Sequence, residues 1–249
     1  MMVQDMILVC AGTESVRARE SGLRLLQFGL RLQADGSVYR ALLSGKQEYL
    51  GVMDQGMKRF SAPTCGQLIA EAQRTGASAI FLDCENHTQA VDEFLKALDQ
   101  QTEKHKLRLF VPLCQAQSVT HACLVASTAI SGGCLRERFQ ELIRQYPGRV
   151  AADLRAISRD FLLPSANTEG TPLSVQARDA LRGKTGAQTF FSRELCARYF
   201  TYMDEKNNGH FVLFDDADTL QAKCRCLQEL EVSPIFARYG DVCDFLPTL

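Results

Sequence analysis

The sequence of 249 residues contains no tryptophan, although it has fourteen phenylalanines and six tyrosines. It also lacks an excess of charge of either sign, because 28 basic side chains are balanced by 29 acidic ones. A nearly neutral chain has no overall electrostatic attraction to nucleic acid or to an anionic membrane surface. We therefore expect neither of them as a partner.

The sequence has little that suggests export, membrane insertion or metal binding. The apolar run at residues 6–11 is too short to span a bilayer and has no basic segment before it. The ten cysteines form no Cys-x-x-Cys pair, and the four histidines are isolated, so a metal site is not expected. We expect buried free thiols in a reducing compartment, and hence a cytoplasmic protein without a cofactor.

Short apolar runs alternate with amphipathic helical segments. Strands are expected at residues 6–11, 24–32, 48–54, 77–83, 107–113, 121–127, 149–157, 210–215 and 232–238. Helices are expected at residues 64–75, 88–104, 134–145, 192–203 and 217–230. Several strands are almost continuously apolar, which is typical of parallel strands covered on both faces.

This alternation predicts an α/β fold, a single-domain (β/α)₈ barrel over residues 1–249. An open doubly wound sheet is the alternative. Residues 25–32 and 38–43 could instead pair as a β-hairpin around the turn at residues 34–36. The polar stretch around residues 163–190 predicts an insertion into the barrel.

Asp83 and Glu85 end one predicted strand and, because side chains alternate, lie on the same face of it. The carboxyl ends of barrel strands form the mouth where active sites lie. Repulsion between two carboxylates raises one pKa, as a general acid requires. The alternative is a polar strand end at which the next helix begins.

Two other segments have a functional and a structural interpretation. Ser131, Gly132 and Gly133 join a strand to a helix, where backbone amides can bind an anion; the alternative is a tight turn that needs glycine. Asp153 and Arg155 share a strand face, either as an ion pair at the mouth or as a structural or solvated pair.

The segment that ends in Asp83 and Glu85 is followed by an amphipathic helix with a basic end and by Leu-Arg-Leu-Phe-Val-Pro at residues 107–112. This order resembles the centre of the family 18 glycoside hydrolases, the chitinase-like barrels, whose fourth strand carries Asp-x-x-Asp-x-Asp-x-Glu. Residues 211–223 are similar to the family's Tyr-Asp-Asp … Ser … Lys segment. Residues 232–239 then match its eighth strand, so that residues 210–215 form an accessory strand.

The resemblance implies that Glu85 is the proton donor and that Asp83 positions the acetamido group of the substrate. The chain departs from the family at Ser78 and Phe81, which stand where two further carboxylates belong. Residues 125–129 contain no Tyr-Asp pair, and residues 236–238 have no tryptophan as the floor of the sugar site.

The resulting hypothesis is a divergent glycoside hydrolase-like protein that acts on or binds an N-acetylated amino sugar. Glu85 and Asp83 are its candidate catalytic residues, and Phe81, Arg155, Phe236 and Arg238 are its candidate sugar contacts. One alternative is an inactive barrel that binds a glycan or a protein. Another is a metabolic barrel that binds phosphate at the 131–133 loop. The expected partner is a small saccharide or another small ligand, and the oligomeric state is left open.

Overall fold

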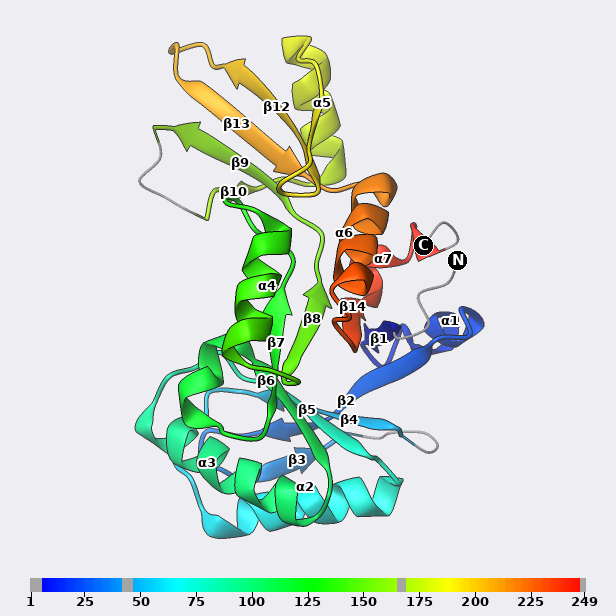
Figure 1. Cartoon of the computed structure of the whole chain (residues 1–249), viewed down its shortest axis with the longest axis vertical. Helices are drawn as coiled ribbons and strands as arrows, with labels where there is room; N and C mark the ends of the chain where they lie inside the picture. Colours follow the sequence, from blue (N-terminus) through cyan, green and yellow to red (C-terminus); the bar gives the residue numbers. More distant parts are fainter. Residues whose placement is uncertain (1–5, 42–46, 165–168, 247–249) are drawn as a thin grey trace.

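The computed structural model describes residues 6–41, 47–164 and 169–246. Eight parallel strands form its main sheet: β1 (Met6–Cys10), β2 (Arg24–Leu32), β4 (Tyr49–Asp54), β5 (Ala79–Asp83), β6 (Arg108–Pro112), β7 (Cys123–Ser127), β8 (Val150–Leu154) and β14 (Ile235–Arg238). Because β1 pairs with both β14 and β2, the sheet closes into a barrel (Figure 1). The predicted (β/α)₈ barrel is confirmed, and the open doubly wound alternative is wrong.

The hairpin expected near the N-terminus is also present, as an addition to the barrel. Strand β3 (Val38–Arg40) pairs antiparallel with β2, which itself pairs in parallel with β4. The helix α1 (Ser15–Glu20) precedes β2, and the helix α7 (Tyr239–Val242) follows β14.

The helices around the barrel include α2 (Ala62–Thr75), α3 (Gln89–Lys104), α4 (Leu135–Gln145) and α6 (Ala217–Glu229), and a 3-10 helix (Leu113–Ser118) follows β6. Their apolar stripes face the sheet, as Phe94, Leu95 and Leu98 of α3 show by being completely buried. Helix α6 begins with a capping box of Asp216 and Thr219.

The barrel interior is a packed core. Apolar side chains from all eight strands form one cluster, with the ring of Phe236 at its centre. The centroid of that ring lies 4.7 Å from Phe81, 5.1 Å from Phe110 and 6.1 Å from Tyr49. The carboxyl ends of the strands form the face where barrel active sites lie, so the search for a site begins there.

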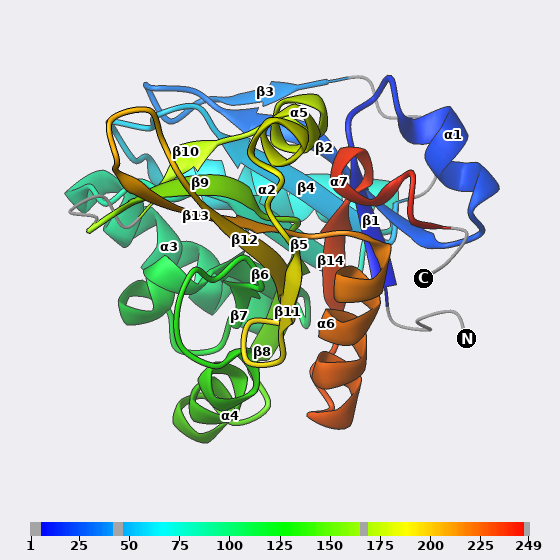
Figure 2. The same cartoon turned by 90° about the horizontal axis from the view of Figure 1, so that it is seen from above.

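A second, antiparallel sheet is inserted between β8 and α6. Its order is β10-β9-β13-β12-β11. The strands are β9 (Ser158–Leu163), β10 (Thr171–Pro172), β11 (Phe190–Ser192), β12 (Ala197–Met203) and β13 (Gly209–Phe214), with α5 (Val175–Thr185) on one side (Figures 1 and 2). The polar stretch at residues 163–190 lies within this unit. Strand β13 is the accessory strand that the family resemblance implies.

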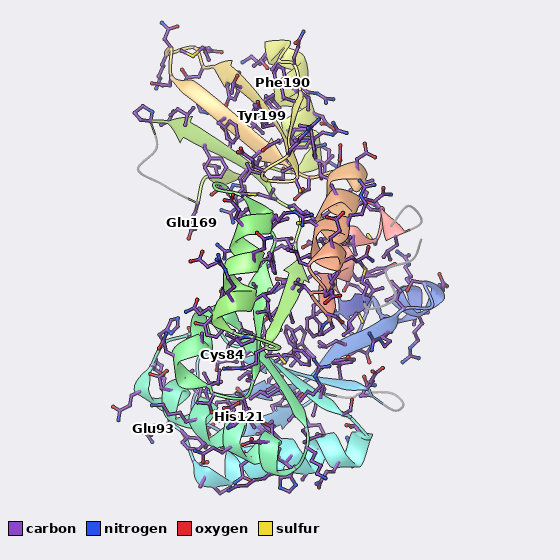
Figure 3. The ribbon with its side chains drawn as sticks, viewed as in Figure 1. Cys84, Glu93, His121, Glu169, Phe190 and Tyr199 are labelled. Atoms are coloured by element: carbon purple, nitrogen blue, oxygen red, sulfur yellow. The ribbon has the colours of Figure 1, made fainter. Side chains whose placement is uncertain are left out.

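The helix expected at residues 192–203 is wrong, because this segment forms β12. Adjacent aromatic residues of this strand lie on opposite faces: Phe200 is buried in a cluster with Leu181 of α5, whereas Tyr199 contacts Phe190 and Phe211. Tyr199 and Phe190 both lie in the inserted sheet (Figure 3). Aromatic and β-branched residues favour strands, and a turn with Cys196 at φ +50° separates β11 from β12.

The insertion is connected to the barrel through a buried ion pair. Asp215 and Lys223 lie 2.6 Å apart, and their side chains are 0% and 1% exposed. The same carboxylate accepts a hydrogen bond from the backbone N–H of Ile157, and the Asp215 N–H donates to the Ile157 carbonyl, both at 2.8 Å. The chain therefore leaves and re-enters the barrel at one point.

Candidate active site

A small pocket lies at the carboxyl end of the barrel, with a volume of about 90 Å³. We call it the mouth pocket. Its lining residues come from the ends of seven barrel strands: Val9, Phe28, Phe81, Asp83, Glu85, Pro112, Val125, Ser127, Asp153, Arg155 and Arg238. It combines apolar walls with three carboxylates and two guanidinium groups, which is the composition of a site that binds one small polar group.

Asp83 and Glu85 both line this pocket. Asp83 is the last residue of β5, which is the fourth parallel strand of the barrel along the chain. Glu85 follows two residues later and is exposed at the rim, whereas Asp83 is half-buried. The structure therefore brings the two candidate catalytic carboxylates to one pocket, on the strand at which the family resemblance places them.

A network that sequence reasoning missed holds the chain around Glu85. Asp54, at the end of β4, accepts hydrogen bonds from the Asn86 side chain (2.6 Å) and the Cys84 thiol (3.4 Å). The Gln115 side chain donates to the carbonyls of Cys84 (3.1 Å) and Asn86 (2.9 Å). Both neighbours of Glu85 are therefore anchored. Asp54 could have been suspected, because it too ends a predicted strand.

Two arginines form ion pairs with aspartates of the pocket. Arg155 Nη2 lies 3.1 Å from Asp153 Oδ2, and Arg238 Nη2 lies 3.6 Å from Asp83 Oδ2. Both contacts are ion pairs, and the second is too long for a hydrogen bond. The predicted interpretation of Asp153 and Arg155 as an ion pair at the mouth therefore agrees with the geometry.

Burial dominates the ionisation of Asp153. Its side chain is 17% exposed, and loss of hydration raises its pKa, while Arg155 and then Arg238 lower it and Asp241 and Asp83 raise it. Burial also raises the pKa of Asp241, on α7, against the lowering effect of the same two arginines. The charges of β5, β8, β14 and α7 thus act on one another at this side of the mouth.

The backbone of Arg155 is hydrogen-bonded to Thr128, and one N–H group of its side chain, at Nε, has no acceptor among the described residues. Its N–H donates to the buried hydroxyl of Thr128 at 3.1 Å, and that hydroxyl lies 3.4 Å from the Arg155 carbonyl. The Nε atom of Arg155 is buried, and among the described residues it has no hydrogen-bond acceptor. A buried donor without an acceptor is unfavourable, so this position suits a ligand that supplies one.

Phe81 and Phe236 have different positions. Phe81 is half-buried and forms part of the pocket wall, as expected for a residue that contacts a ligand. Phe236 is completely buried beneath Phe81 and does not line the pocket. It faces inward on β14 one layer below Arg238, so it fills the barrel and has no free ring face for a sugar. Arg238 lies at the rim, in the segment where the family resemblance implies an aromatic residue under the sugar.

The loop of Ser131, Gly132 and Gly133 is exposed and does not line the mouth pocket. Gly133 has φ +77°, as the tight-turn interpretation requires. The first backbone amide of α4, at Leu135, donates to the Glu194 carbonyl of the insertion. Arg136 forms an ion pair with Glu229. The first amide of α4 and the guanidinium group of Arg136 are therefore engaged within the protein.

The described part of the chain contains no group of three histidine, cysteine or acidic side chains arranged to hold a metal ion. None of its helices has both the length and the apolar composition needed to cross a bilayer.

The described chain folds as a closed eight-stranded barrel with an inserted antiparallel sheet. No family model and no curated protein matches this chain. Solved structures do: the structural likeness has a TM-score of 0.63 to a chitinase from Chromobacterium violaceum, at 15% sequence identity over 98% of this chain and 97% of that one.

Two further similar structures belong to the same structural class. The spore cortex-lytic enzyme SleL from Bacillus megaterium gives a TM-score of 0.62 at 16% identity, over 95% of this chain and 70% of the enzyme. A class V chitinase from Nicotiana tobaccum, also solved in complex with NAG4, gives 0.54 at 10% identity over 98% of both chains. These likenesses confirm the resemblance to the family 18 barrels at the level of the fold.

Proposed function

We propose that this chain is a divergent family 18 glycosidase that binds an N-acetylated amino sugar at the mouth pocket and cleaves it with Glu85 as general acid. One observation carries the proposal: Asp83 and Glu85 follow the fourth barrel strand and line the same pocket at the carboxyl end of the barrel. Similar folds that bear the names of chitinases and a cortex-lytic enzyme support the same substrate class.

The size of the pocket suits a substituent of the sugar. A volume of about 90 Å³ is far below the roughly 300–1,000 Å³ of sites that enclose a whole ligand. An acetamido group would enter the pocket, where the Asp83 carboxylate can accept its N–H. The sugar ring would then lie at the rim, beside the exposed carboxyl group of Glu85.

The proposed reaction proceeds through the substrate's own acetamido group. The Glu85 carboxyl group donates its proton to the glycosidic oxygen as the bond from that oxygen to C1 breaks. The acetamido oxygen forms a bond to C1 in its place, and Asp83 holds the acetamido nitrogen. The Glu85 carboxylate then removes a proton from water, whose oxygen bonds to C1 and displaces the acetamido oxygen.

One arrangement favours a second candidate function, a barrel that binds the sugar without cleaving it. No carboxylate lies below Asp83 on β5, because Phe81 occupies that layer and packs against Phe236. Ser78 lies just before β5, and its hydroxyl donates to the Glu48 carbonyl at the far end of the strand. Asp83 instead faces Arg238, so its environment differs from the acidic network that the family motif implies.

The test combines hydrolysis and binding on the full chain. Release of a fluorophore from N-acetylglucosaminide oligomers is measured for the wild type, for Glu85→Gln and for Glu141→Gln, an exposed glutamate of α4 that serves as control. Loss of a general acid lowers the rate about 10²–10⁴-fold, so Glu85→Gln should lose activity to that extent. Its affinity for the oligomer, measured by calorimetry, should change less than threefold.

The outcomes separate the candidates. Full activity of Glu85→Gln would refute the role of Glu85. Binding by a wild type that does not hydrolyse the oligomers supports the second candidate. A wild type that neither binds nor cleaves any N-acetylated oligomer contradicts both.

A further inference from the structure

The mouth pocket contains a carboxyl group that the proposed reaction does not use. Asp153 lies on β8, the seventh barrel strand, and lines the same pocket as Asp83. Its side chain is more deeply buried than those of the two proposed reacting carboxylates: Asp83 is 25% exposed, Glu85 lies at the rim, and Asp153 is 17% exposed. A buried carboxyl group within a binding pocket is a functional candidate with a physical rationale.

Among the charged groups that act on Asp153, counted with Asp153 itself, the carboxyl groups outnumber the guanidinium groups by one. The groups that act on it are the guanidinium groups of Arg155 and Arg238 and the carboxyl groups of Asp83 and Asp241. Three ionised aspartates and two arginines leave an excess of one negative charge at a partly buried place. A proton on one aspartate removes this excess. Asp153 is the member best suited to hold it, because its side chain is more buried than that of Asp83 and burial, the largest influence on its pKa, raises that pKa.

Asp153 provides an acidic side chain at the mouth pocket, whereas β5 lacks one of the acidic residues of the family motif. Phe81 stands where the family motif has the carboxylate nearest to Asp83, so β5 provides no acidic neighbour inside the barrel. Asp153 pairs with Arg155, while Asp83 faces Arg238. Ser127↔Asp153 and Phe236↔Asp153 are register partners across β7 and β14, which places the Asp153 backbone at the same layer as Phe236.

We propose that Asp153 is the positioning carboxyl group of this site and that it takes over, from the seventh strand, the role of the carboxylate that Phe81 has replaced on the fourth. This inference rests on the proposed function. When Asp153 is protonated, it is neutral and does not attract the Arg238 guanidinium group, which then pairs with Asp83. Asp83 thereby stays ionised and fixed in position as the acceptor for the acetamido N–H. In its ionised form Asp153 competes with Asp83 for Arg238, and Asp83 loses that support.

The sign of the pH dependence follows from this assignment. The protonated form of Asp153 is the competent one, so affinity for the acetamido sugar falls as the pH rises through the raised pKa of Asp153. Asp153→Asn keeps a neutral side chain of the same shape at every pH. Its affinity should therefore stay within threefold of the wild-type value at low pH and should lack the wild-type loss at higher pH.

The experiment measures the Kd of an N-acetylglucosamine tetramer by calorimetry between pH 4 and pH 9, where roughly the whole titration range of a raised carboxyl pKa is covered. It uses the wild type, Asp153→Asn, Asp153→Ala and, as a matched control, Asp179→Asn on α5. Asp153→Ala should weaken binding at least tenfold relative to Asp153→Asn at low pH, because it removes the polar group beside Arg155, and it too should lack the loss at higher pH. Asp179→Asn should follow the wild-type curve. A curve for Asp153→Asn with the same high-pH loss as the wild type would overturn the assignment.

A second measurement does not depend on the sugar. The side-chain carboxyl carbon of Asp153 is followed by NMR through a pH titration in the wild type and in Asp83→Asn. The Asp153 pKa should be raised in the wild type and should fall in Asp83→Asn, because the charge of Asp83 contributes to raising it. An ordinary, unchanged pKa refutes the inference even in a protein that binds no sugar. Failure of tetramer binding at every pH, by contrast, refutes the proposed function.

Discussion

Removal of Lys223 from the buried ion pair with Asp215 should destabilise the protein more than the loss of any single surface charge. The two side chains are 1% and 0% exposed, and the Asp215 Oδ1 atom has no hydrogen-bond partner within the described residues. Lys223→Met keeps most of the volume of the side chain but leaves the Asp215 carboxylate buried without its cation. Among the described residues, the N–H of Ile157 is then the one hydrogen-bond donor left to it.

The expected magnitude is large compared with the stability of a domain. Breaking a buried pair from one side costs about 3–5 kcal/mol, out of a typical total free energy of unfolding of about 5–15 kcal/mol. For a chain of this length each kcal/mol lowers Tm by about 2–4 °C, so Tm should fall by about 6–20 °C. The exposed pair of Lys184 with Glu205 provides the matched control: Lys184→Met should change stability by less than about 1 kcal/mol.

Urea and thermal denaturation, followed by circular dichroism, measure these changes. The double variant Asp215→Leu with Lys223→Met should be more stable than Lys223→Met alone, because it removes the unpaired charge. It should remain below the wild type, since the Ile157 N–H loses its acceptor. A loss of less than about 1 kcal/mol in Lys223→Met, or a double variant less stable than the single one, would refute the reasoning.

Three further predictions concern the barrel. Leu98→Ala, at a completely buried position of α3, should lower the free energy of unfolding by about 2–5 kcal/mol in urea titrations, and a change below about 1 kcal/mol would contradict the packing. Thr88→Ala removes the side-chain acceptor of the Val91 N–H at the start of α3 and should cost about 0.5–2 kcal/mol by the same assay, with Thr88→Ser close to the wild type. Burial raises the pKa of Cys84 to about 12, so iodoacetamide at pH 8 should label the exposed Cys114 well before Cys84, as peptide mass spectrometry would show; equal rates would contradict the burial.

The sequence was sufficient to predict the barrel because its strands are apolar on both faces. Residues 24–32 and 79–83 form strands close to the expected bounds, and the stripe of Phe94, Leu95 and Leu98 is buried as the helical period requires. The error at residues 192–203 arose because Leu195, Tyr199 and Phe200 fit a helical stripe, whereas in the structure Tyr199 and Phe200 lie on opposite faces of a strand and both contact other side chains. Pairing with β13, which is distant in the sequence, determines the result.

Only those parts of the site could be predicted that depend on the alternation of side chains along a single strand. Asp83 and Glu85 share a face by the period of two, and the structure brings both to the mouth pocket. The depth of a residue along the barrel axis depends on the stagger between strands, which one sequence does not reveal. Phe236 was therefore expected at the rim, where Arg238 lies, and the support of the Cys84 segment by Gln115 had no local signal.

The contact between Ile157 and Asp215 has a consequence for how such a protein can change during evolution. The insertion begins and ends at residues that are hydrogen-bonded to each other, and Ser158 and Phe214 are partners in the first step of its sheet. Segments whose two ends lie close together can be lengthened, shortened or exchanged without altering the spacing of the elements that carry them. Selection can therefore reshape the inserted sheet while the barrel strands that carry Asp83, Glu85 and Asp153 keep their places.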